Sequence, residues 1–569
     1  MRNLLITTLV LLIFSVKVLS SGIQVLNTTV TTNDDKTSAT VKFTLIWDHS
    51  WRLDPADPGP KNWDAAWVFI KFRTLPGDNW SHGYIKQAGS DMPSNAEFKI
   101  GNSIAVVGGV NSTVGVGAFI YRKDPGSGQV VFTDCELYWD FASNGLTGGE
   151  QVEVCVLATE MVHIPAGAFY LGDYSSVGRF TRNRSNNRAE DAIYVNAANP
   201  AHLGYFSNAW LINAGYANTS NGLINSSIST NTAVAPDDIF TGQTANNTNQ
   251  RIAYNYGNTT ANNSGLFMSG VNANYPRGYN AFYCMKYEIT QGEYLQFLNK
   301  NLVAVKNAAF YIDTTTAPSA RFNIRKKPGT GTPVIPAEYE FINPSSAYLP
   351  CNFLGTKDIM AWLIWAGLRP MTELEYEKVC RGPELIPGTA TLRPQYAWGS
   401  VNIYPAAGFS NKGGSNEGPS NTTGNVAVAT TGGAAIGGGT NDDLDGPMRA
   451  GGFANPVSSR EKAGATYYGV MEMSGNLWER CVSVGIDAGR AFLGNLVAAH
   501  GNGEIGPAIN PDLPIGGGWP PVNAAGLGFR GGSYLDHSDR ARISDRQFIN
   551  LNNATRHASF GGRGVRTDL

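Results

Sequence analysis

Hydrophobic residues stand at every second position in segment 41–47, and this alternation restricts the fold more than any other feature. The alternating residues are Val41, Phe43, Leu45 and Trp47. A period of two places these side chains on one face of a β-strand, so a half-buried strand is expected over residues 39–47. Similar short patterns follow at residues 67–72, 129–133 and 151–157. Short strands separated by turns predict an all-β, immunoglobulin-like sandwich over residues 22–158.

The charge balance of the chain excludes several classes of partner. Lys and Arg total 43, Asp and Glu total 45, and 15% of all residues are charged. No run of basic residues stands out, so neither a nucleic acid nor an anionic membrane surface is an expected partner. The 66 glycines and 29 prolines favour many turns and few long helices.

The first twenty residues resemble a secretory signal peptide. Arg2 precedes a hydrophobic run at residues 4–16, and small residues follow from Ser20 to Gly22. The run is too short to cross the roughly 30 Å of a bilayer as a helix. A buried N-terminal strand or helix is the alternative interpretation. No later hydrophobic run is long enough for a membrane span, so we expect a secreted or cell-surface protein with its signal peptide at residues 1–20.

The cysteines are few and widely spaced. They are Cys135, Cys155, Cys284, Cys351, Cys380 and Cys481. An even number in an oxidising compartment allows up to three disulfides, although six are too sparse for a disulfide scaffold and buried free thiols are the alternative. The sequence contains no CxxC or HExxH motif, so no transition-metal site of a familiar type is predicted.

A second unit is predicted over residues 159–569, with two insertions rich in small residues. The first, residues 181–280, holds 21 asparagines, and asparagine favours turns over helices. We expect it to form ordered loops, with disorder as the alternative. The second, residues 413–440, is rich in Gly and Thr.

Between the two insertions, Thr372 and Glu375 form a capping box, which marks the start of a helix. Helices are predicted at residues 288–298, 357–368 and 373–380.

Six motifs of the second unit occur in the order found in a known enzyme family. They are Met161–Gly172, Cys284–Tyr294, Leu368–Lys378, Tyr468–Glu479, Phe529–Ser533 and Gly562–Arg566. Together they resemble the formylglycine-generating enzymes, also called sulfatase-modifying factors. The resemblance implies an α+β fold of C-type-lectin-like type with long loops, here preceded by the immunoglobulin-like sandwich.

Members of this family bind structural Ca²⁺, and the resemblance implies two such sites in this chain. The first comprises Glu472, Gly475, Leu477 and Glu479, of which Gly475 and Leu477 contribute backbone carbonyls. The second comprises Asn411, Lys412, Asp445 and Pro447, of which Lys412 and Pro447 contribute carbonyls. Carboxylate and carbonyl oxygens are the donors that Ca²⁺ prefers. Solvated loop carboxylates without a metal are the alternative at both sites.

The residues that carry catalysis in the family are missing from this chain. The resemblance implies two cysteines that bind Cu(I), and the corresponding positions here are Asp536 and Ala541. Cu(I) selects soft thiolates, which neither a carboxylate nor a methyl group can replace. No cysteine lies beyond Cys481. We therefore expect neither copper nor the generating activity.

A polar cluster remains beside these two positions. Residues 530–541 are expected to form a strand, on which Asp536 and His537 point to opposite faces. Together with Asp539 they could in principle bind a metal or transfer a proton. We instead expect a polar loop with surface ion pairs to Arg540 and Arg542.

These observations favour a secreted, non-catalytic member of the family that acts as a binding or structural module. Its partner would be a glycan, a peptide or protein ligand, or another copy of the chain. Candidate ligand-binding residues are Trp519, Tyr534, Asp536 and His537, and Trp210, Trp519 and Tyr534 are expected at the surface as aromatic contacts. Three alternatives remain: an oxidoreductase of the formylglycine-generating type with an atypical active site, a diversity-generating variable protein that uses residues 546–566, and a surface-layer or filament subunit.

Overall fold

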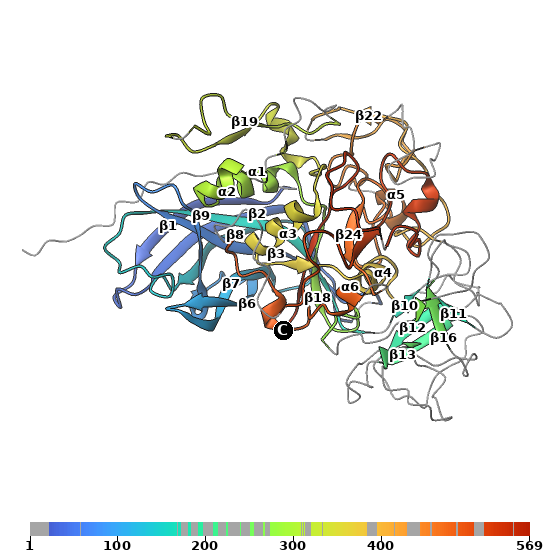
Figure 1. Ribbon diagram of the computed structural model, residues 1–569, viewed down its shortest axis with the longest axis horizontal. Coiled ribbons are helices and arrows are strands. Elements are labelled where there is room, and N and C mark those ends of the chain that lie inside the picture. Colours follow the sequence, from blue (N-terminus) through green and yellow to red (C-terminus); the bar gives the residue numbers. More distant parts are fainter. Residues whose placement is uncertain are drawn as a thin grey trace, which may run out of the picture.

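One twelve-stranded sheet runs through the computed structural model, and the strand pairs within it are antiparallel (Figure 1). The structure describes residues 22–171 except 57 and 168, the strands within 172–273, and residues 274–569 except 309, 311, 313–319, 333, 384–394, 415, 430–443, 456–457, 485–486, 506–516 and 550. The predicted signal peptide at residues 1–20 lies outside this described part.

Nine strands of the sheet come from the N-terminal part of the chain. They are β1 (Gln24–Thr32), β2 (Ala39–Arg52), β3 (Asp64–Thr74), β4 (Ser81–Gly83), β5 (Ile85–Asp91), β6 (Ala96–Val107), β7 (Val110–Arg122), β8 (Gly126–Trp139) and β9 (Val152–Ile164). Their order in the sheet is β1-β2-β8-β5-β7-β3-β9, with β4 beside β3 and β6 beside β7. The predicted strand over residues 39–47 is confirmed and extends to Arg52.

The sheet continues into the rest of the chain without a break. Strand β9 pairs with β3 along one edge and with β18 (Phe282–Met285) along the other. Strands β26 (Gly564–Thr567) and β21 (Arg369–Pro370) then complete the sheet. The predicted boundary between residues 158 and 159 therefore falls inside β9. Both predicted units contribute to one sheet.

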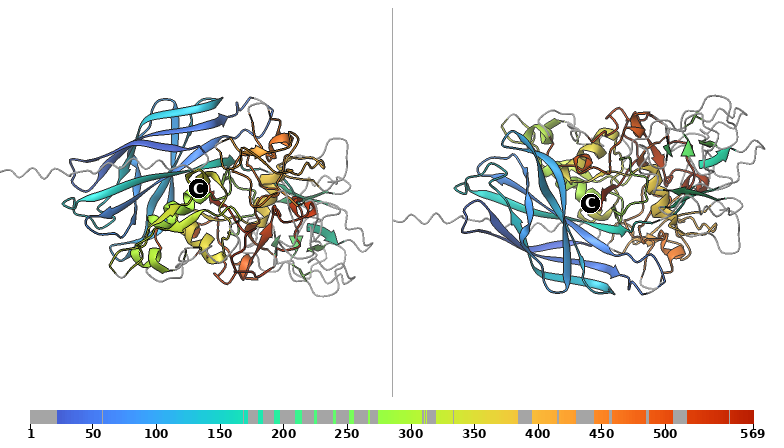
Figure 2. Two further views of the ribbon diagram at one scale, coloured as in Figure 1. Left: turned by 90° about the horizontal axis from the view of Figure 1, so that it is seen from above. Right: turned by 90° about the horizontal axis from the view of Figure 1, so that it is seen from below.

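The layer formed by β3, β7 and β9 is covered on both faces. On one face Val68 and Ile70 of β3 join a core cluster with Val41 and Phe43 of β2. On the other face, Trp67 and Phe69 join the main core cluster together with residues of helix α3 (Thr356–Trp365). The views of Figure 2 show the blue N-terminal strands on one side of the molecule and the later helices and loops on the other. This arrangement explains why β3 is hydrophobic on both faces.

The helices are short and begin at recognisable caps. Helices α1 (Gln291–Asn299), α3 (Thr356–Trp365) and α4 (Glu373–Arg381) correspond to the three predicted helices. The predicted capping box is confirmed: Glu375 N donates to Thr372 Oγ1 at 3.1 Å, and Thr372 N donates to Glu375 Oε2 at 3.0 Å. The other helices are α2 (Val303–Ala308), α5 (Arg460–Ala463) and α6 (Asp487–Arg490), and the 3₁₀ segments are η2 (Pro344–Tyr348), η3 (Val497–Ala499) and η4 (Ser538–Ala541).

The remaining strands form small separate sheets. They are β19 (Ile324–Lys326) with β20 (Tyr339–Phe341), β22 (Phe409–Ser410) with β23 (Gly418–Pro419), and β24 (Glu479–Val482) with β25 (Leu527–Arg530). Strands described in and around the first predicted insertion are β10 (Phe169–Leu171), β11 (Phe180–Asn183), β12 (Ala192–Asn196), β13 (Ala209–Asn213), β14 (Ile224–Asn225), β15 (Ile239–Phe240), β16 (Arg251–Tyr254) and β17 (Leu266–Phe267). Residues 274–280 of that insertion are described as well, whereas its remaining residues, and residues 415 and 430–440 of the second, lie outside the described residues.

All six cysteines are buried and none forms a disulfide. Cys284, Cys380 and Cys481 pack into one core cluster as small hydrophobic side chains. The three disulfides that the even count allowed are therefore absent, and the alternative of buried thiols is confirmed.

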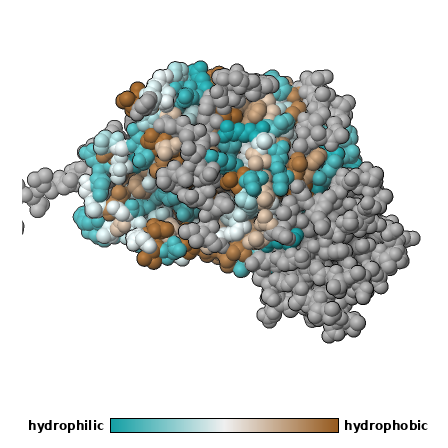
Figure 3. Space-filling model, in the orientation of Figure 1, coloured by the Kyte–Doolittle hydropathy of each residue, from teal (hydrophilic) through white to brown (hydrophobic). Residues whose placement is uncertain are grey.

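The surface mixes hydrophobic and hydrophilic residues. On the face shown in Figure 3, hydrophobic residues of the described part lie in small groups among hydrophilic ones. The turn between β6 and β7 exposes Val106 and Val110. None of the described helices combines the length and hydrophobicity needed to cross a bilayer.

Helix α4 carries three glutamates that are buried together with arginines. Glu373 accepts from Arg546 at 2.5 Å, and Glu375 accepts from Arg369 at 2.6 Å. Glu377 accepts from Arg530 at 2.7 Å. The side chains of these pairs are no more than 2% exposed. Since an unpaired buried carboxylate is strongly unfavourable, these arginines hold α4 in place.

Removal of Arg546 is expected to destabilise the fold strongly. Arg546→Met leaves Glu373 buried with one fewer cationic partner, which should lower the free energy of unfolding by about 3–5 kcal/mol. Arg325→Met is the matched control, because its ion pair with Glu340 has side chains that are 51% and 36% exposed and should cost less than about 1 kcal/mol. Urea unfolding measures both variants, and equal effects would contradict the role assigned to the buried pair.

Candidate functional site

Strands β24 and β25 position the segment that holds the two expected catalytic positions. Glu479 of β24 pairs with Arg530 of β25, after which the backbone turns at Gly531 and Gly532, with φ of 93° and 73°. A Cβ on Gly532 would lie 3.0 Å from the backbone nitrogen of Ala541, so the turn requires glycine there. The prediction of a strand over residues 530–541 is therefore wrong: the strand ends at Arg530, and Ser538–Ala541 form η4.

Asp536 is buried and its carboxylate supports the loop. The residue is 3% exposed. Its Oδ2 accepts from Trp478 Nε1 at 2.6 Å and also from the Ser533 hydroxyl. The carboxylate thus joins the loop to the buried indole of Trp478. The first position implied for a copper-binding cysteine is occupied by a hydrogen-bonded structural group.

Ala541 is fully buried in a small hydrophobic cluster. Its neighbours there include Tyr396, Trp398 and Val428. The Ala541 carbonyl accepts from the Ser474 hydroxyl at 2.6 Å. A methyl group in such packing offers no electron pair to a metal. The residues at both positions therefore do not fit Cu(I), which requires soft sulfur ligands.

Two glutamates of the first predicted calcium site lie buried with one unpartnered oxygen each. Glu472 Oε1 accepts from Gly451 N at 2.9 Å, and Glu479 Oε1 accepts from Arg563 Nε at 2.8 Å. The Oε2 atoms of both glutamates are buried and have no hydrogen-bond partner among the described residues. Burial raises the pKa of Glu472 to about 7. These two oxygens are available to a cation.

Glu288 is a third buried carboxylate in this region, and it orders the loop of the predicted site. Its Oε1 accepts from Leu477 N at 2.9 Å, and its Oε2 accepts from Asn476 Nδ2 at 2.7 Å. Burial, followed by the charge of Glu479, raises the pKa of Glu288 well above its usual value. The sequence analysis missed this role, and the position of Glu288 inside the motif Cys284–Tyr294 was the only signal.

Arg563 supplies positive charge to the same region. Its guanidinium pairs with Glu479 and donates to the carbonyls of Met471 at 2.8 Å and Met285 at 3.1 Å. Within the described residues, no group of three or more His, Cys, Asp or Glu side chains could hold a metal ion. A cation here would therefore depend on Glu472, Glu479 and backbone carbonyls. That donor set consists of oxygen alone and fits Ca²⁺.

Two donors of the second predicted calcium site are engaged by cationic side chains. Lys412 Nζ lies 2.6 Å from Asp445 Oδ2, and both side chains are more than half exposed. The Pro447 carbonyl accepts from Arg321 Nη1 at 2.6 Å. Asn411 has a positive φ of 48°, and its carbonyl accepts from Gly414 N. A calcium ion would compete with Lys412 for Asp445 and with Arg321 for the Pro447 carbonyl, so these contacts support this site less than the first.

The structure places most of the predicted ligand-binding side chains in the interior. Trp519 is 5% exposed and its Nε1 donates to the Ala499 carbonyl at 2.7 Å. Tyr534 is 2% exposed and packs in a cluster with Leu477. The expectation that these two rings lie at the surface is wrong, because both fill core space. Trp210 belongs to β13, and its side chain lies outside the described residues.

His537 is the exposed member of the predicted ligand-binding set. Its side chain is 44% exposed and lies 3.3 Å from Asp539. Asp539 pairs with Arg542 at 2.6 Å, as expected. Arg540 instead lies 3.6 Å from Asp545. The cluster is a polar loop with ion pairs, as the sequence predicted.

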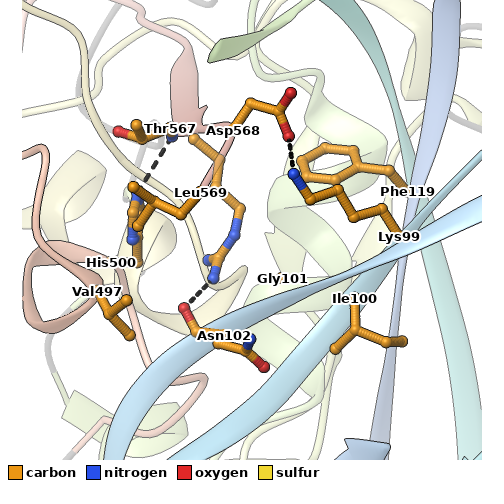
Figure 4. A pocket seen from close by; sticks show the side chains of 11 residues that line it. Lys99, Ile100, Gly101, Asn102, Phe119, Val497, His500, Thr567, Asp568 and Leu569 are labelled. Carbon is orange, nitrogen blue, oxygen red and sulfur yellow. Dashed lines mark hydrogen bonds and ion pairs between the residues drawn. The ribbon is translucent and has the colours of Figure 1, made fainter. Parts of the chain in front are cut away.

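A cavity of about 200 Å³ lies where the C-terminal end of the chain meets β6 (Figure 4). Its charged groups contact one another or the backbone: Lys99 Nζ lies 2.6 Å from Asp568, and Arg566 donates to the Asn102 carbonyl. Thr567 N donates to His500 Nε2 at 3.1 Å. Burial lowers the pKa of His500 well below its usual value, which keeps this ring neutral as an acceptor. The contacts around the cavity join β26 to β6.

The model of one protein family matches residues 238–567, and its description is sulfatase-modifying factor enzyme 1-like domain. The matched region covers more than half of the chain. It contains Glu288, the loop of the first predicted calcium site, and both positions at which thiols are absent. No curated protein matches the sequence.

Buried Glu472 is expected to make stability depend on pH when a chelator is present. Its pKa is about 7 in the folded protein and about 4.3 in an unfolded chain, so the native state binds this proton more tightly. Stability should therefore fall as pH rises from about 4.3 to 7. Glu472→Gln keeps an oxygen acceptor for Gly451 N and should raise the free energy of unfolding at pH 8 by up to about 3 kcal/mol, with little change at pH 4.5.

Urea unfolding at both pH values, in a buffer with a chelator, measures this difference. Asp445→Asn is the control, because that carboxylate is exposed and its removal should change stability equally at both pH values. A difference between wild type and Glu472→Gln that does not vary with pH would contradict the prediction.

Proposed function

The chain belongs to the family of sulfatase-modifying factor enzyme 1-like domains, and on this basis we propose that it is a secreted, non-catalytic member that acts as a binding or structural module. The observation that carries this proposal is the pair Asp536 and Ala541. Both residues are buried, one in hydrogen bonds and the other in hydrophobic packing. Catalysis of the formylglycine-generating type requires thiolates for Cu(I), which these residues cannot provide.

We extend the proposal to the finer classification of the fold. The family region would have a C-type-lectin-like fold, and the N-terminal strands an immunoglobulin-like sandwich. Support for the first comes from the short helices and the many loops of residues 274–569. Support for the second comes from the core cluster that β2 and β8 share with β3 and β7. Aligned β-layers packed face to face are typical of sandwiches.

The partner in this proposal is a glycan, a peptide or protein, or another copy of the chain. A surface with small hydrophobic groups among polar ones (Figure 3) suits polar recognition. His537 is exposed near the end of the loop that follows β25. Leu551 and Thr555 are exposed and lie in the middle of residues 546–566, whose two ends are buried. These loops are the surfaces on which we place ligand contacts, since loops on a rigid scaffold commonly carry binding.

Calcium is a structural component of the proposal at the first site only. Glu472 and Glu479 would hold the ion together with the backbone carbonyls of Gly475 and Leu477. The ion would neutralise two buried carboxylates. Support comes from the two unpartnered Oε2 atoms described above. Glu288 would keep the loop ordered through Leu477 and Asn476.

Absence of the generating activity is tested directly with copper. Incubation of the protein with Cu(I), oxygen and a cysteine-containing sulfatase peptide should leave the thiol mass of the peptide unchanged in mass spectrometry. Titration against a Cu(I) chelator should show no stoichiometric copper on the protein. Conversion of the peptide cysteine to an aldehyde would establish the alternative, an oxidoreductase with an atypical active site.

Calcium is expected to stabilise the wild-type protein by mass action. At a concentration about a hundred times its Kd, an ion that binds only the native state adds about 2.7 kcal/mol to the free energy of unfolding. Differential scanning fluorimetry should show a rise in Tm on calcium addition to the chelator-treated protein. Glu472→Gln should abolish the rise, whereas Asp445→Asn at the second predicted site should retain it. An unchanged Tm in the wild type would remove calcium from the proposal.

A further inference from the structure

A second cavity, of about 290 Å³, opens between β3, α1 and α2, and its lining is mostly polar. Its volume is close to the lower end of small-molecule sites, roughly 300–1,000 Å³. Three cationic side chains line it: Arg73, Lys300 and Lys306. Gln296 of α1 lines the same cavity. Helices α1 and α2 are drawn next to each other in Figure 1. This cavity shares no lining residue with the calcium site or with the positions of the missing thiols.

Two of the three cations already have partners. Arg73 lies 2.6 Å from Glu153 and 2.8 Å from Asp78. Lys300 lies 3.8 Å from Glu153, and its ammonium sits 3.8 Å from the centroid of the Trp80 ring. Asp78 and Glu153 are therefore committed mainly to Arg73, and Glu338, which also lines the cavity, lies 3.0 Å from Lys327. In the described part of the chain, none of these three carboxylates forms an ion pair with the third cation.

Lys306 is the cation that lacks a partner. The residue is 7% exposed, and among the described residues its Nζ makes no hydrogen bond or ion pair. Its backbone is fixed, because its N donates to the Leu302 carbonyl and its carbonyl accepts from the Tyr339 hydroxyl. A nearly buried lysine whose ammonium has no direct ion-pair partner is unfavourable. An anion in the cavity would supply that partner.

The charges around Lys306 support the same conclusion. Burial, together with the charges of Arg73 and Lys300, lowers the pKa of Lys306 to about 8, against the opposing charges of Asp78 and Glu338. The group is thus charged at neutral pH, and the two neighbouring cations disfavour its charge. An anion would bind best to the protonated ammonium, so its affinity should fall as the pH rises through about 8.

We propose that this cavity binds the oxyanion group of a small ligand, a carboxylate or a sulfate, with Lys306 as the principal counter-charge. Lys300 provides a second cation at the cavity wall, and the Gln296 amide offers a hydrogen-bond donor beside it. The cavity leaves room for the carrier of that group, such as one acidic sugar unit. This site extends the proposed function but does not depend on it, since none of its residues takes part in the family's catalytic or calcium-binding positions.

Isothermal titration calorimetry with sodium glucuronate, sodium sulfate and neutral glucose, at constant ionic strength, tests the proposal. We expect glucuronate or sulfate to bind the wild-type protein at pH 7 and glucose not to bind. Equal affinities for both anions would indicate that the oxyanion alone is recognised. Tighter binding of glucuronate would indicate that the sugar ring contributes. Affinity should fall at pH 9 relative to pH 7.

Lys306→Gln removes the charge and keeps a polar side chain that is one atom shorter, and it should weaken anion binding at least tenfold. The matched control is Lys42→Gln, because Lys42 is a 43% exposed lysine on β2 that is paired with Glu136, and its removal should leave binding unchanged. Lys300→Gln is a second variant in case Lys306→Gln fails to fold, and it should weaken binding to a smaller extent. Absence of binding by both anions, or unchanged binding in the folded Lys306→Gln variant, would overturn the proposal.

Discussion

Buried charge pairs between glutamate and arginine are the interaction on which the rest of the family region depends. Glu373, Glu375 and Glu377 all lie in the interior although they share one short helix. Their arginine partners come from β21, β25 and the segment after η4. Because each carboxylate requires its cation, α4 can pack only when the nearby β21 and the two segments far along the chain are in place. A chain with few helices and many loops thus obtains a defined core.

A similar group of charges joins the N-terminal strands to the family region. Lys286, next to β18, lies 2.9 Å from Glu160 of β9 and 3.5 Å from Asp64 of β3. Asp64 in turn accepts from Trp47 Nε1 at 2.9 Å. The lysine is 4% exposed, so these contacts are shielded from water and salt. They explain why the sheet passes through the predicted domain boundary without interruption.

The scaffold and the chemistry of the family are separable in this chain. The buried ion pairs of α4, and the ion pair between Arg563 and Glu479, hold the strands of the family region together. At the two expected copper positions, Asp536 accepts a hydrogen bond from Trp478 and Ala541 fills a hydrophobic cluster. Under the proposed function, the positions that would hold copper in an enzyme of the formylglycine-generating type serve only as structural positions here. A fold does not imply the activity of its family, because activity depends on a few side chains.

Local patterns in the sequence determined the strand β2, the capping box of α4 and the missing sulfur ligands at Asp536 and Ala541, because each depends on neighbours in the chain or on side-chain chemistry alone. The tertiary structure alone decided which polar and aromatic groups are buried. It placed Trp519 and Tyr534 in the core, brought Glu288 to the loop of Glu472 and Glu479, and left Lys306 without a direct ion-pair partner among the described residues. Burial and charge balance arise from partners far apart in the sequence, and no local pattern records them.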